Sequence, residues 1–174
     1  KNNANYVALS PITFLERTKD VYPDYEAAVY GSRKYTWLDV YKRATRFASA
    51  LEKIGVGIGD TVSIMACNTP ELFEAHYSIP MTGAVINAIN TRLDSKTVGY
   101  ILEHSDAKVL IADRQFHKII KKALEGVKRK IIIIDIDDKQ ANLKDQGKIG
   151  DHEYESFLKT GDDNYQWKKP TDEW

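Results

Sequence analysis

Apolar side chains recur at three- and four-residue steps along residues 37–54, the strongest pattern in the chain. The apolar positions are Trp37, Val40, Tyr41, Ala44, Phe47, Ala48, Leu51 and Ile54. This spacing places them on one face of an amphipathic helix. Thr36 can cap that helix, with Asp39 three residues further on, and Gly55 can end it. The pattern therefore predicts a single helix from about Thr36 to Ile54.

Shorter patterns before this helix predict a second helix and a hairpin. Ser10-Pro11 joins a capping hydroxyl to a proline at the first helical position, which is typical of a helix start. That helix is expected to run to about Asp20. The extended segments 27–30 and 34–36 flank Gly31-Ser32-Arg33, a turn sequence that predicts a β-hairpin.

Beyond residue 60, short apolar runs alternate with helical patterns. The predicted strands are 61–66, 84–89, 109–112 and 131–135, and the predicted helices are 69–83, 94–104, 113–125 and 151–159. Strands that alternate with helices of about ten or more residues indicate βαβ units and a largely parallel sheet. The predicted fold class is therefore α/β, layered, with a mostly parallel sheet and helices on both faces. We expect the strands around Val62, Val85, Leu110 and Ile132 to share that sheet.

Two further segments complete the predicted organisation. The polar stretch 137–150 is predicted to be a surface loop, and the sequence after Thr160 has the character of a linker. We therefore assign residues 1–160 to one α/β subdomain and residues 161–174 to a linker. The final residues, Asp172-Glu173-Trp174, form neither a helix end nor a closing strand, so we expect an N-terminal fragment of a larger protein.

Composition narrows the possible partners and surroundings. Hydrophobic residues make up 43% and charged residues 29% of the 174, which is typical of a globular domain. Lys and Arg number 25, as do Asp and Glu, so no nucleic-acid surface is predicted. Cys67 is the sole cysteine, which fits a reducing compartment. No apolar run approaches the roughly 20 residues of a membrane span, so we predict no transmembrane segment and a cytoplasmic location.

Motifs that could carry chemistry have simpler structural interpretations. Gly55-Val56-Gly57-Ile58-Gly59 follows a helix and precedes a strand, the reverse of a dinucleotide-binding loop, so a helix cap and tight turn are favoured. A Walker-type phosphate loop is absent from the sequence. Cys67 has no neighbouring base and is interpreted as a structural thiol. The four histidines show no metal-binding spacing, and no metal site is predicted.

Two charged clusters leave alternatives open. The basic residues are Lys118, Lys121, Lys122, Lys128, Arg129 and Lys130. They indicate either a solvated helix face or a patch that attracts a phosphate-bearing ligand. The sequence Asp135-Ile136-Asp137-Asp138 suggests a carboxylate cluster for a metal, but Asp137-Asp138 begins a polar loop, so solvation explains it more simply.

An ordered series of short motifs resembles the AMP-forming acyl-CoA synthetases of the adenylate-forming ligase superfamily. The series begins with Tyr30-Gly31, Tyr35-Thr36-Trp37 and Gly59-Asp60-Thr61-Val62. It continues with Asn68-Thr69-Pro70-Glu71, Pro80-Met81-Thr82-Gly83-Ala84-Val85, Asn90-Thr91-Arg92-Leu93 and His104-Ser105-Asp106-Ala107-Lys108-Val109, and resumes at Lys169 to Trp174. Within the superfamily, the chain looks most similar to the N-terminal portion of medium-chain and plant-type acyl-activating enzymes.

The resemblance implies a two-step reaction for the parent enzyme. A carboxylic acid, expected to be a fatty acid, is joined to the α-phosphate of ATP with Mg²⁺ assistance, and the acyl group then passes to CoA. The family's phosphate loop, ribose-binding acidic residue and catalytic lysine are expected beyond Trp174. We therefore assign no catalytic residue here, expect no cofactor bound to this chain alone, and expect it to be inactive by itself. Its expected partners are the acid, CoA and the remainder of the same enzyme.

The resemblance also marks one candidate site. Asn90, Thr91 and Arg92 directly follow a predicted strand, and ligands of open α/β sheets lie beyond the carboxyl ends of strands. We predict that these residues lie near the acyl-binding or CoA-binding channel. Arg92 can pair with a CoA phosphate or form an ordinary surface salt bridge. The alternative function is a non-catalytic nucleotide-binding or scaffold α/β domain.

Overall fold

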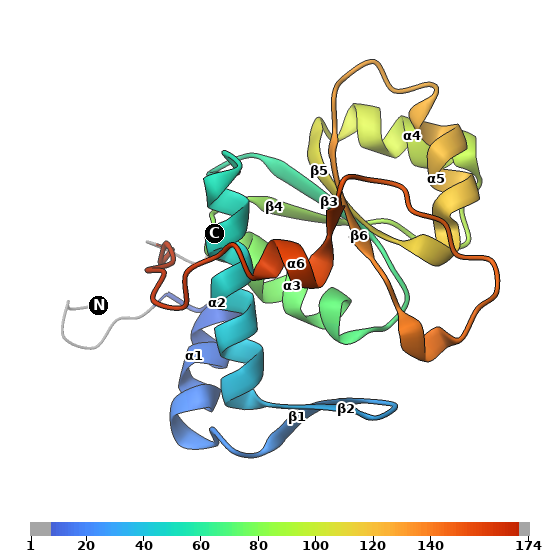
Figure 1. Ribbon diagram of the computed structural model, residues 1–174. Coiled ribbons are helices and arrows are strands. Elements are labelled where there is room, and N and C mark those ends of the chain that lie inside the picture. The colour runs from blue at the N-terminus through green and yellow to red at the C-terminus, as the bar shows by residue number, and fades with distance from the viewer. Residues whose placement is uncertain (1–7, 171–174) are drawn as a thin grey trace.

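The computed structural model describes residues 8–170 as alternating helices and strands (Figure 1). The α-helices are α1 (Pro11–Val21), α2 (Trp37–Lys53), α3 (Pro70–Met81), α4 (Ser95–His104), α5 (His117–Leu124) and α6 (Tyr154–Leu158). The strands are β1 (Glu26–Tyr30), β2 (Arg33–Thr36), β3 (Thr61–Met65), β4 (Val85–Ala88), β5 (Ala107–Asp113), β6 (Ile132–Ile136) and β7 (His152–Glu153). Two short 3₁₀ turns are η1 (Arg114–Phe116) and η2 (Lys139–Ala141).

The central sheet has the strand order β4-β3-β5-β6-β7, and every neighbouring pair is parallel. Val62 of β3 faces Ile86 on one side and Val109 on the other, which fixes the register at the middle of the sheet. The chain leaves β3 for β4 on one side and then crosses to β5 on the other. This reversal between β3 and β5 is the topological switch point of a doubly wound sheet.

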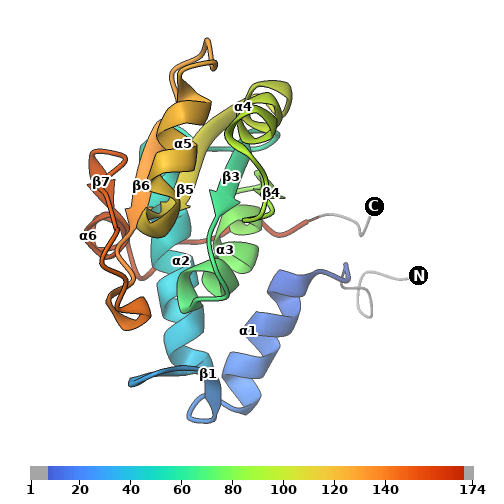
Figure 2. The same cartoon turned by 90° about the vertical axis from the view of Figure 1, so that its right-hand side faces the viewer.

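Side chains alternate between the two faces of the sheet along each strand. Helices cover both of these faces. Val62 and Ile64 point to a core formed with α2, α3 and α6, which includes Phe47 and Phe157. Met65 and Leu110 belong to the core on the opposite face. That second core is closed by α4 and α5, which lie together on the other side of the sheet (Figure 2).

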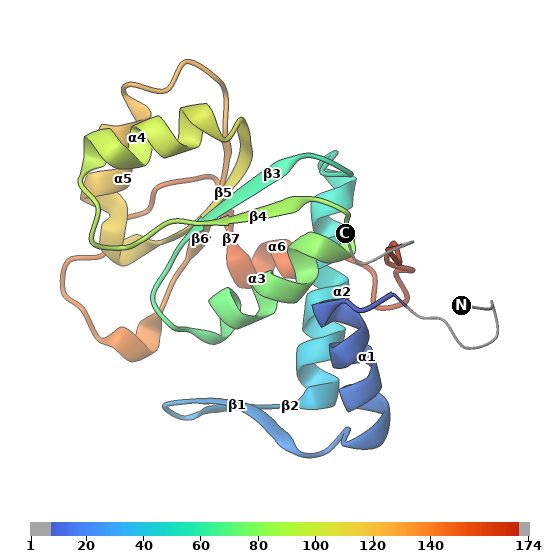
Figure 3. The same cartoon turned by 180° about the vertical axis from the view of Figure 1, so that it is seen from behind.

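A third cluster joins α1 to the body of the molecule. Ile12 and Leu15 of α1 are buried against Val40, Met81 and Trp167. The antiparallel pair β1–β2 forms a separate two-stranded sheet that projects from the end of α2 (Figure 3). None of the helices in residues 8–170 is both long and apolar enough to cross a membrane.

The principal predictions of fold are confirmed. The helix predicted for residues 36–54 is α2, which begins with a capping box between Thr36 and Asp39. The strands around Val62, Val85 and Leu110 share one sheet with the strand around Ile132. The fold class is α/β with a five-stranded parallel sheet and helices on both faces.

One predicted helix is partly wrong. Within residues 151–159, His152–Glu153 forms β7, and only Tyr154–Leu158 is helical. Glu153 explains the change, because its carboxylate accepts hydrogen bonds from the backbone N–H groups of Glu155 and Ser156 and so starts α6. A two-residue strand is too short to give a periodic signal in the sequence.

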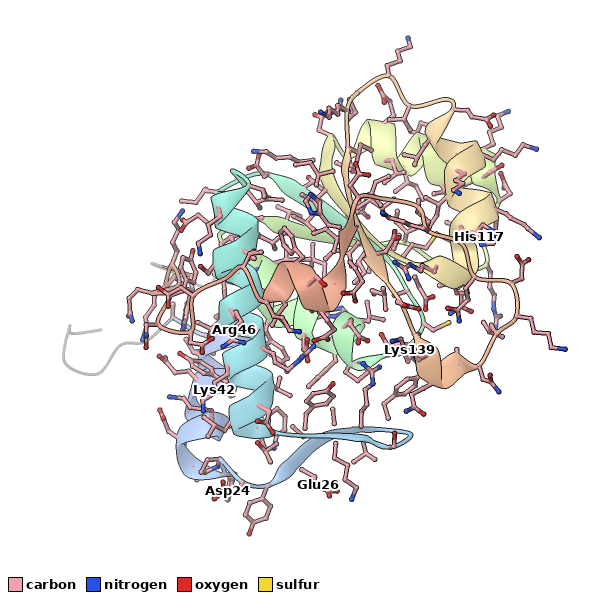
Figure 4. All side chains as sticks on the ribbon, viewed as in Figure 1. Asp24, Glu26, Lys42, Arg46, His117 and Lys139 are labelled. Atoms are coloured by element: carbon pink, nitrogen blue, oxygen red, sulfur yellow. The ribbon has the colours of Figure 1, made fainter. Side chains whose placement is uncertain are left out.

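The segment predicted as a linker packs against the helices. Residues 161–170 form neither helix nor strand, but Trp167 is 7% exposed and the backbone N–H of Lys168 donates to the carbonyl of Met81. Arg46, on α2 (Figure 4), forms an ion pair with Asp163. Residues 171–174, which complete the predicted linker, lie outside the described residues.

Candidate functional site

The carboxyl ends of β3 and β5 meet at the switch point of the sheet. Cys67 follows β3, whereas Asp113 ends β5 and Gln115 lies in the η1 turn directly after it. A crevice beyond strand ends at a switch point is where open α/β sheets bind ligands. This edge of the sheet is therefore the candidate functional site.

A short hydrogen-bonded chain links these three side chains. The amide of Gln115 donates to Asp113 Oδ2 at 2.7 Å and to Cys67 Sγ at 3.3 Å. Burial raises the pKa of Asp113, and burial also raises the pKa of the Cys67 thiol. A raised thiol pKa lowers the fraction of the reactive thiolate, which favours the structural interpretation of Cys67.

The hairpin is anchored to the same edge. Arg33 of β2 donates to Glu71 of α3, with 2.5 Å between Nη1 and Oε1, and Glu71 is 3% exposed. Tyr30 donates its hydroxyl to Asp138 at 2.5 Å. That hydrogen bond is the main reason that the pKa of Tyr30 rises to about 12. These contacts fix the hairpin beside the N-terminus of α3.

The aspartates in and after β6 are paired inside the protein, so the interpretation of Asp137-Asp138 as a solvated loop start is wrong for Asp138. Asp135 is fully buried and accepts from Arg114 Nε and from the backbone N–H groups of residues 149 and 150. Asp138 is 2% exposed and accepts hydrogen bonds from the Tyr30 hydroxyl and from the backbone N–H of Gln140. Asp137 pairs with Arg114 at 2.9 Å.

These pairings also bear on metal binding. Within residues 8–170, no group of three or more His, Cys, Asp or Glu side chains is placed to hold a metal ion. Asp135 and Asp137 both form ion pairs with Arg114. The carboxylate of Asp138 accepts a hydrogen bond from the Tyr30 hydroxyl. The described residues therefore do not fit a Mg²⁺ site, and no reaction step can be assigned to one here.

A second buried network lies one turn further along α3 and joins this helix to α2 and α6. Glu74 is fully buried, and its carboxylate accepts from Arg43 Nε of α2 at 2.5 Å and from the Tyr154 hydroxyl of α6 at 3.1 Å. Arg43 also donates to Glu155 at 2.5 Å. Burial raises the pKa of Glu74 to about 7, although Arg43 opposes that rise. Sequence reasoning missed this network, whose one local signal is the pair of acidic residues Glu71 and Glu74 one turn apart in a largely apolar helix.

Asn90, Thr91 and Arg92 lie in a turn after β4, at the same edge of the sheet. Asn90 Oδ1 accepts the backbone N–H of Arg92 at 2.9 Å, which shapes the turn. Asn90 and Arg92 are exposed, and Thr91 is half-buried. No hydrogen bond or ion pair joins them to Cys67 or Asp113 within the described residues. Arg92 is exposed to solvent and forms no salt bridge within the described residues.

The remaining motifs adopt their simpler interpretations. Gly55 and Gly59 have φ values of 87° and 81° between α2 and β3, as expected for a helix cap and a tight turn. In the basic cluster, Lys118 pairs with Asp145 and Arg129 pairs with Asp106. These pairings favour a solvated, partly neutralised helix face over a phosphate-binding patch.

A groove of about 400 Å³ lies between β1 and the N-terminus of α3. The residues that line it are Ala27, Ala28, Val29, Tyr30, Asn68, Thr69, Pro70, Leu72, Phe73 and His76. Its volume falls within the range of about 300–1,000 Å³ that is common for small-molecule sites. Sequence reasoning missed this groove, because it depends on how the hairpin packs against α3.

Comparison with known proteins gives a consistent set of relatives. Residues 15–172 match the AMP-binding enzyme family. The chain is 41% identical to acetate–CoA ligase CCL3 of Humulus lupulus, over 100% of this chain and 32% of that protein. It is 42% identical to the peroxisomal acetate/butyrate–CoA ligase AAE7 of Arabidopsis thaliana, over 98% of this chain and 32% of that protein. The chain thus spans about a third of the length of these relatives.

Solved structures share the fold at lower sequence identity. The anthranilate CoA ligase AuaEII, in complex with anthranoyl-AMP, superimposes with a TM-score of 0.84 at 21% identity, over 97% of this chain and 31% of that one. A benzoate CoA ligase from Burkholderia xenovorans LB400 gives a TM-score of 0.74 at 22% identity, over 92% of this chain and 29% of that one. These similarities concern the fold alone.

Proposed function

The chain belongs to the AMP-binding enzyme family, and on that premise we propose that it supplies the N-terminal α/β portion of an ATP-dependent acid–CoA ligase. The observation that carries this proposal is 41% identity over the whole chain to an acetate–CoA ligase. Other relatives are named as butyrate–CoA and benzoate–CoA ligases. The proposed substrate is therefore a short aliphatic or aromatic carboxylic acid, in place of the fatty acid expected from the sequence.

Within that enzyme, the described residues have a positioning role. Bound ATP and Mg²⁺ would supply the activated phosphate and its charge neutralisation. The buried carboxylates of Asp113, Glu71 and Glu74 are hydrogen-bonded within the chain, and burial raises the pKa of the Cys67 thiol. We propose that these groups hold the sheet edge and the hairpin in place and do not react. The chain alone is accordingly expected to be inactive.

A graft tests the proposed function. These 174 residues would replace the matching third of the Humulus lupulus acetate–CoA ligase, and acyl-CoA formation would be measured with acetate, butyrate, benzoate and a long fatty acid. We expect thioester formation with at least one short or aromatic acid. A folded graft that makes no acyl-CoA from any of them would contradict the proposal. The ligase without that third serves as the negative control.

The proposed role of Asn90, Thr91 and Arg92 is to lie near the CoA or acyl channel of the same enzyme. Support comes from their position at the carboxyl edge and from the solvent exposure of Arg92. In the graft, Arg92→Ala should raise the KM for CoA about tenfold and leave the KM for ATP unchanged, because a charge-assisted hydrogen bond to phosphate is lost. Lys96→Ala, which removes an exposed charge from nearby α4, is the matched control. If the two variants have the same KM for CoA, the assignment of Arg92 to the CoA channel is wrong.

The cellular location remains a prediction. The cytoplasmic location expected from composition is compatible with the single cysteine, whereas AAE7 and a butyrate–CoA ligase among the relatives are named as peroxisomal. Imaging of the tagged protein in its source cells distinguishes the two compartments.

A further inference from the structure

The groove between β1 and α3 has a distinct polar end. Thr69 lines it and stands at the N-cap of α3, but its hydroxyl makes no capping hydrogen bond. Thr69 is 3% exposed, and its Oγ1 has no hydrogen-bond partner within the described residues. A buried hydroxyl without a partner costs free energy, so it marks a place where a ligand atom would be stabilising.

Residues next to Thr69 in the sequence carry further unused donors. The first turn of an α-helix leaves backbone N–H groups without intrahelical partners. In the twelve-residue helix α3, Pro70 has no N–H, and those of Glu71 and Leu72 have no partner within residues 8–170. Asn68, exposed at the rim, adds a side-chain amide. All of these groups can donate, so the polar end of the groove is suited to a hydrogen-bond acceptor.

The charge of the site favours an anion. The N-terminus of a helix carries partial positive charge and stabilises carboxylates and phosphates. Glu71 and Asp138 would oppose an anion, but Glu71 is paired with Arg33 at 2.5 Å, and Asp138 lies 4.0 Å from the same guanidinium and accepts the Tyr30 hydroxyl. His76 also lines the groove and is exposed, and its Nδ1 lies 2.8 Å from the carbonyl oxygen of Leu72.

The rest of the groove is apolar. Its walls are formed by Ala27, Ala28 and Val29 of β1 and by Leu72 and Phe73 of α3. Val29 is 57% exposed, so apolar surface remains open to a ligand body. A phosphate or other fully hydrated anion would leave these walls unused.

We propose that this groove binds a small amphipathic carboxylate, with its head at the N-terminus of α3 and its apolar body against β1. The oxygens of the head would accept from Thr69 Oγ1 and from the N–H groups of Glu71 and Leu72. The apolar body would cover Val29 and Phe73. The proposal does not rest on the proposed function, because the groove and its donors belong to the described residues alone.

A titration of the ¹⁵N-labelled chain tests the proposal with hexanoate as the probe. Hexanoate should shift the amide signals of Glu71 and Leu72 saturably. Acetate, which lacks the apolar body, and hexanol, which lacks the carboxylate, should each bind at least about tenfold more weakly, since each loses one part of the recognition.

Two variants test the polar end of the groove and its apolar wall separately. Thr69→Val should weaken hexanoate binding about tenfold, which corresponds to about one hydrogen bond to a charged group. Thr45→Val is the matched control, because Thr45 is also buried with an unpartnered hydroxyl but does not line the groove. Ala28→Phe fills the groove from β1, leaves Thr69 intact and should abolish binding.

Three results would overturn the proposal. These are hexanoate shifts no larger than those of acetate at equal concentration, equal affinities of the Thr69→Val and Thr45→Val variants, and full binding by Ala28→Phe. Unchanged amide signals of α4 and α5, on the opposite face of the sheet, show that each variant keeps the fold.

Discussion

Glu74 shows how a single buried residue can make this protein sensitive to pH. Its carboxylate lies between Arg43 of α2 and Tyr154 of α6, with Glu71 one turn earlier on α3 and Glu155 beyond Arg43. Burial penalises the charged form more than Arg43 stabilises it, so the pKa rises from 4.5 to about 7. The folded protein therefore keeps a proton that the unfolded chain releases.

The sign of the pH dependence follows from this difference. The stability contributed by the Glu74 proton is complete below pH 4.5 and is lost as the pH rises through about 7. The loss is roughly 3 kcal/mol, at about 1.4 kcal/mol per pKa unit. Relative to the parent, Glu74→Gln should therefore gain about that much in unfolding free energy between pH 4.5 and 8.

Urea unfolding of both proteins across this range measures the effect. Glu125→Gln, an exposed change at the end of α5, is the control and should follow the parent at every pH. If Glu74→Gln shows the same pH profile as the parent, Glu74 is not the titrating group.

At the scale of elements, the sequence predicts those helices and strands that have a long periodic pattern of apolar residues. The apolar stripe of α2 and the strand around Leu110 are both found as expected, because local pattern and burial agree there. β7 and the packing of residues 161–170 could not be predicted, because they depend on contacts with distant elements. Trp167, for example, lies in a polar stretch of sequence and is buried only because α1, α2 and α3 form a surface for it.

Gly161 tests the docking of that last segment onto α2. A Cβ atom at this position would overlap the backbone carbonyl oxygen of Arg46. Gly161→Ala should therefore destabilise the fold by about 1–3 kcal/mol, as other overpacked sites do. Gly57→Ala is the matched control, since a Cβ atom at that position meets no atom within 4 Å.

Thermal or urea unfolding compares the two alanine variants. The Gly57 variant should stay within about 0.5 kcal/mol of the parent, as most unconstrained substitutions do. Equal stabilities of the two variants would mean that residues 161–170 do not dock on α2 as described.

At the scale of the whole molecule, the fold follows from the sequence more fully than the site does. The alternation of strands and helices predicts a parallel sheet, and the ordered motifs from Tyr30 to Val109 identify the family. The buried pairs Arg33–Glu71 and Arg43–Glu74 join residues 38 and 31 positions apart, so no local pattern reveals them. Asn90, Thr91 and Arg92 lie at the expected edge, and their contact with a ligand remains a prediction.

The central claim is that these residues form the N-terminal portion of an acid–CoA ligase and do not perform adenylation alone. Acid-dependent ATP–pyrophosphate exchange, measured for the 174-residue chain and for its graft into the Humulus lupulus acetate–CoA ligase, tests it most directly. Without aligned groups to hold and polarise the phosphate, a barrier of several kcal/mol is left in place. We predict no exchange above the acid-free control for the chain alone and clear exchange for the graft. Exchange by the chain alone, or none by a folded graft, would contradict the account.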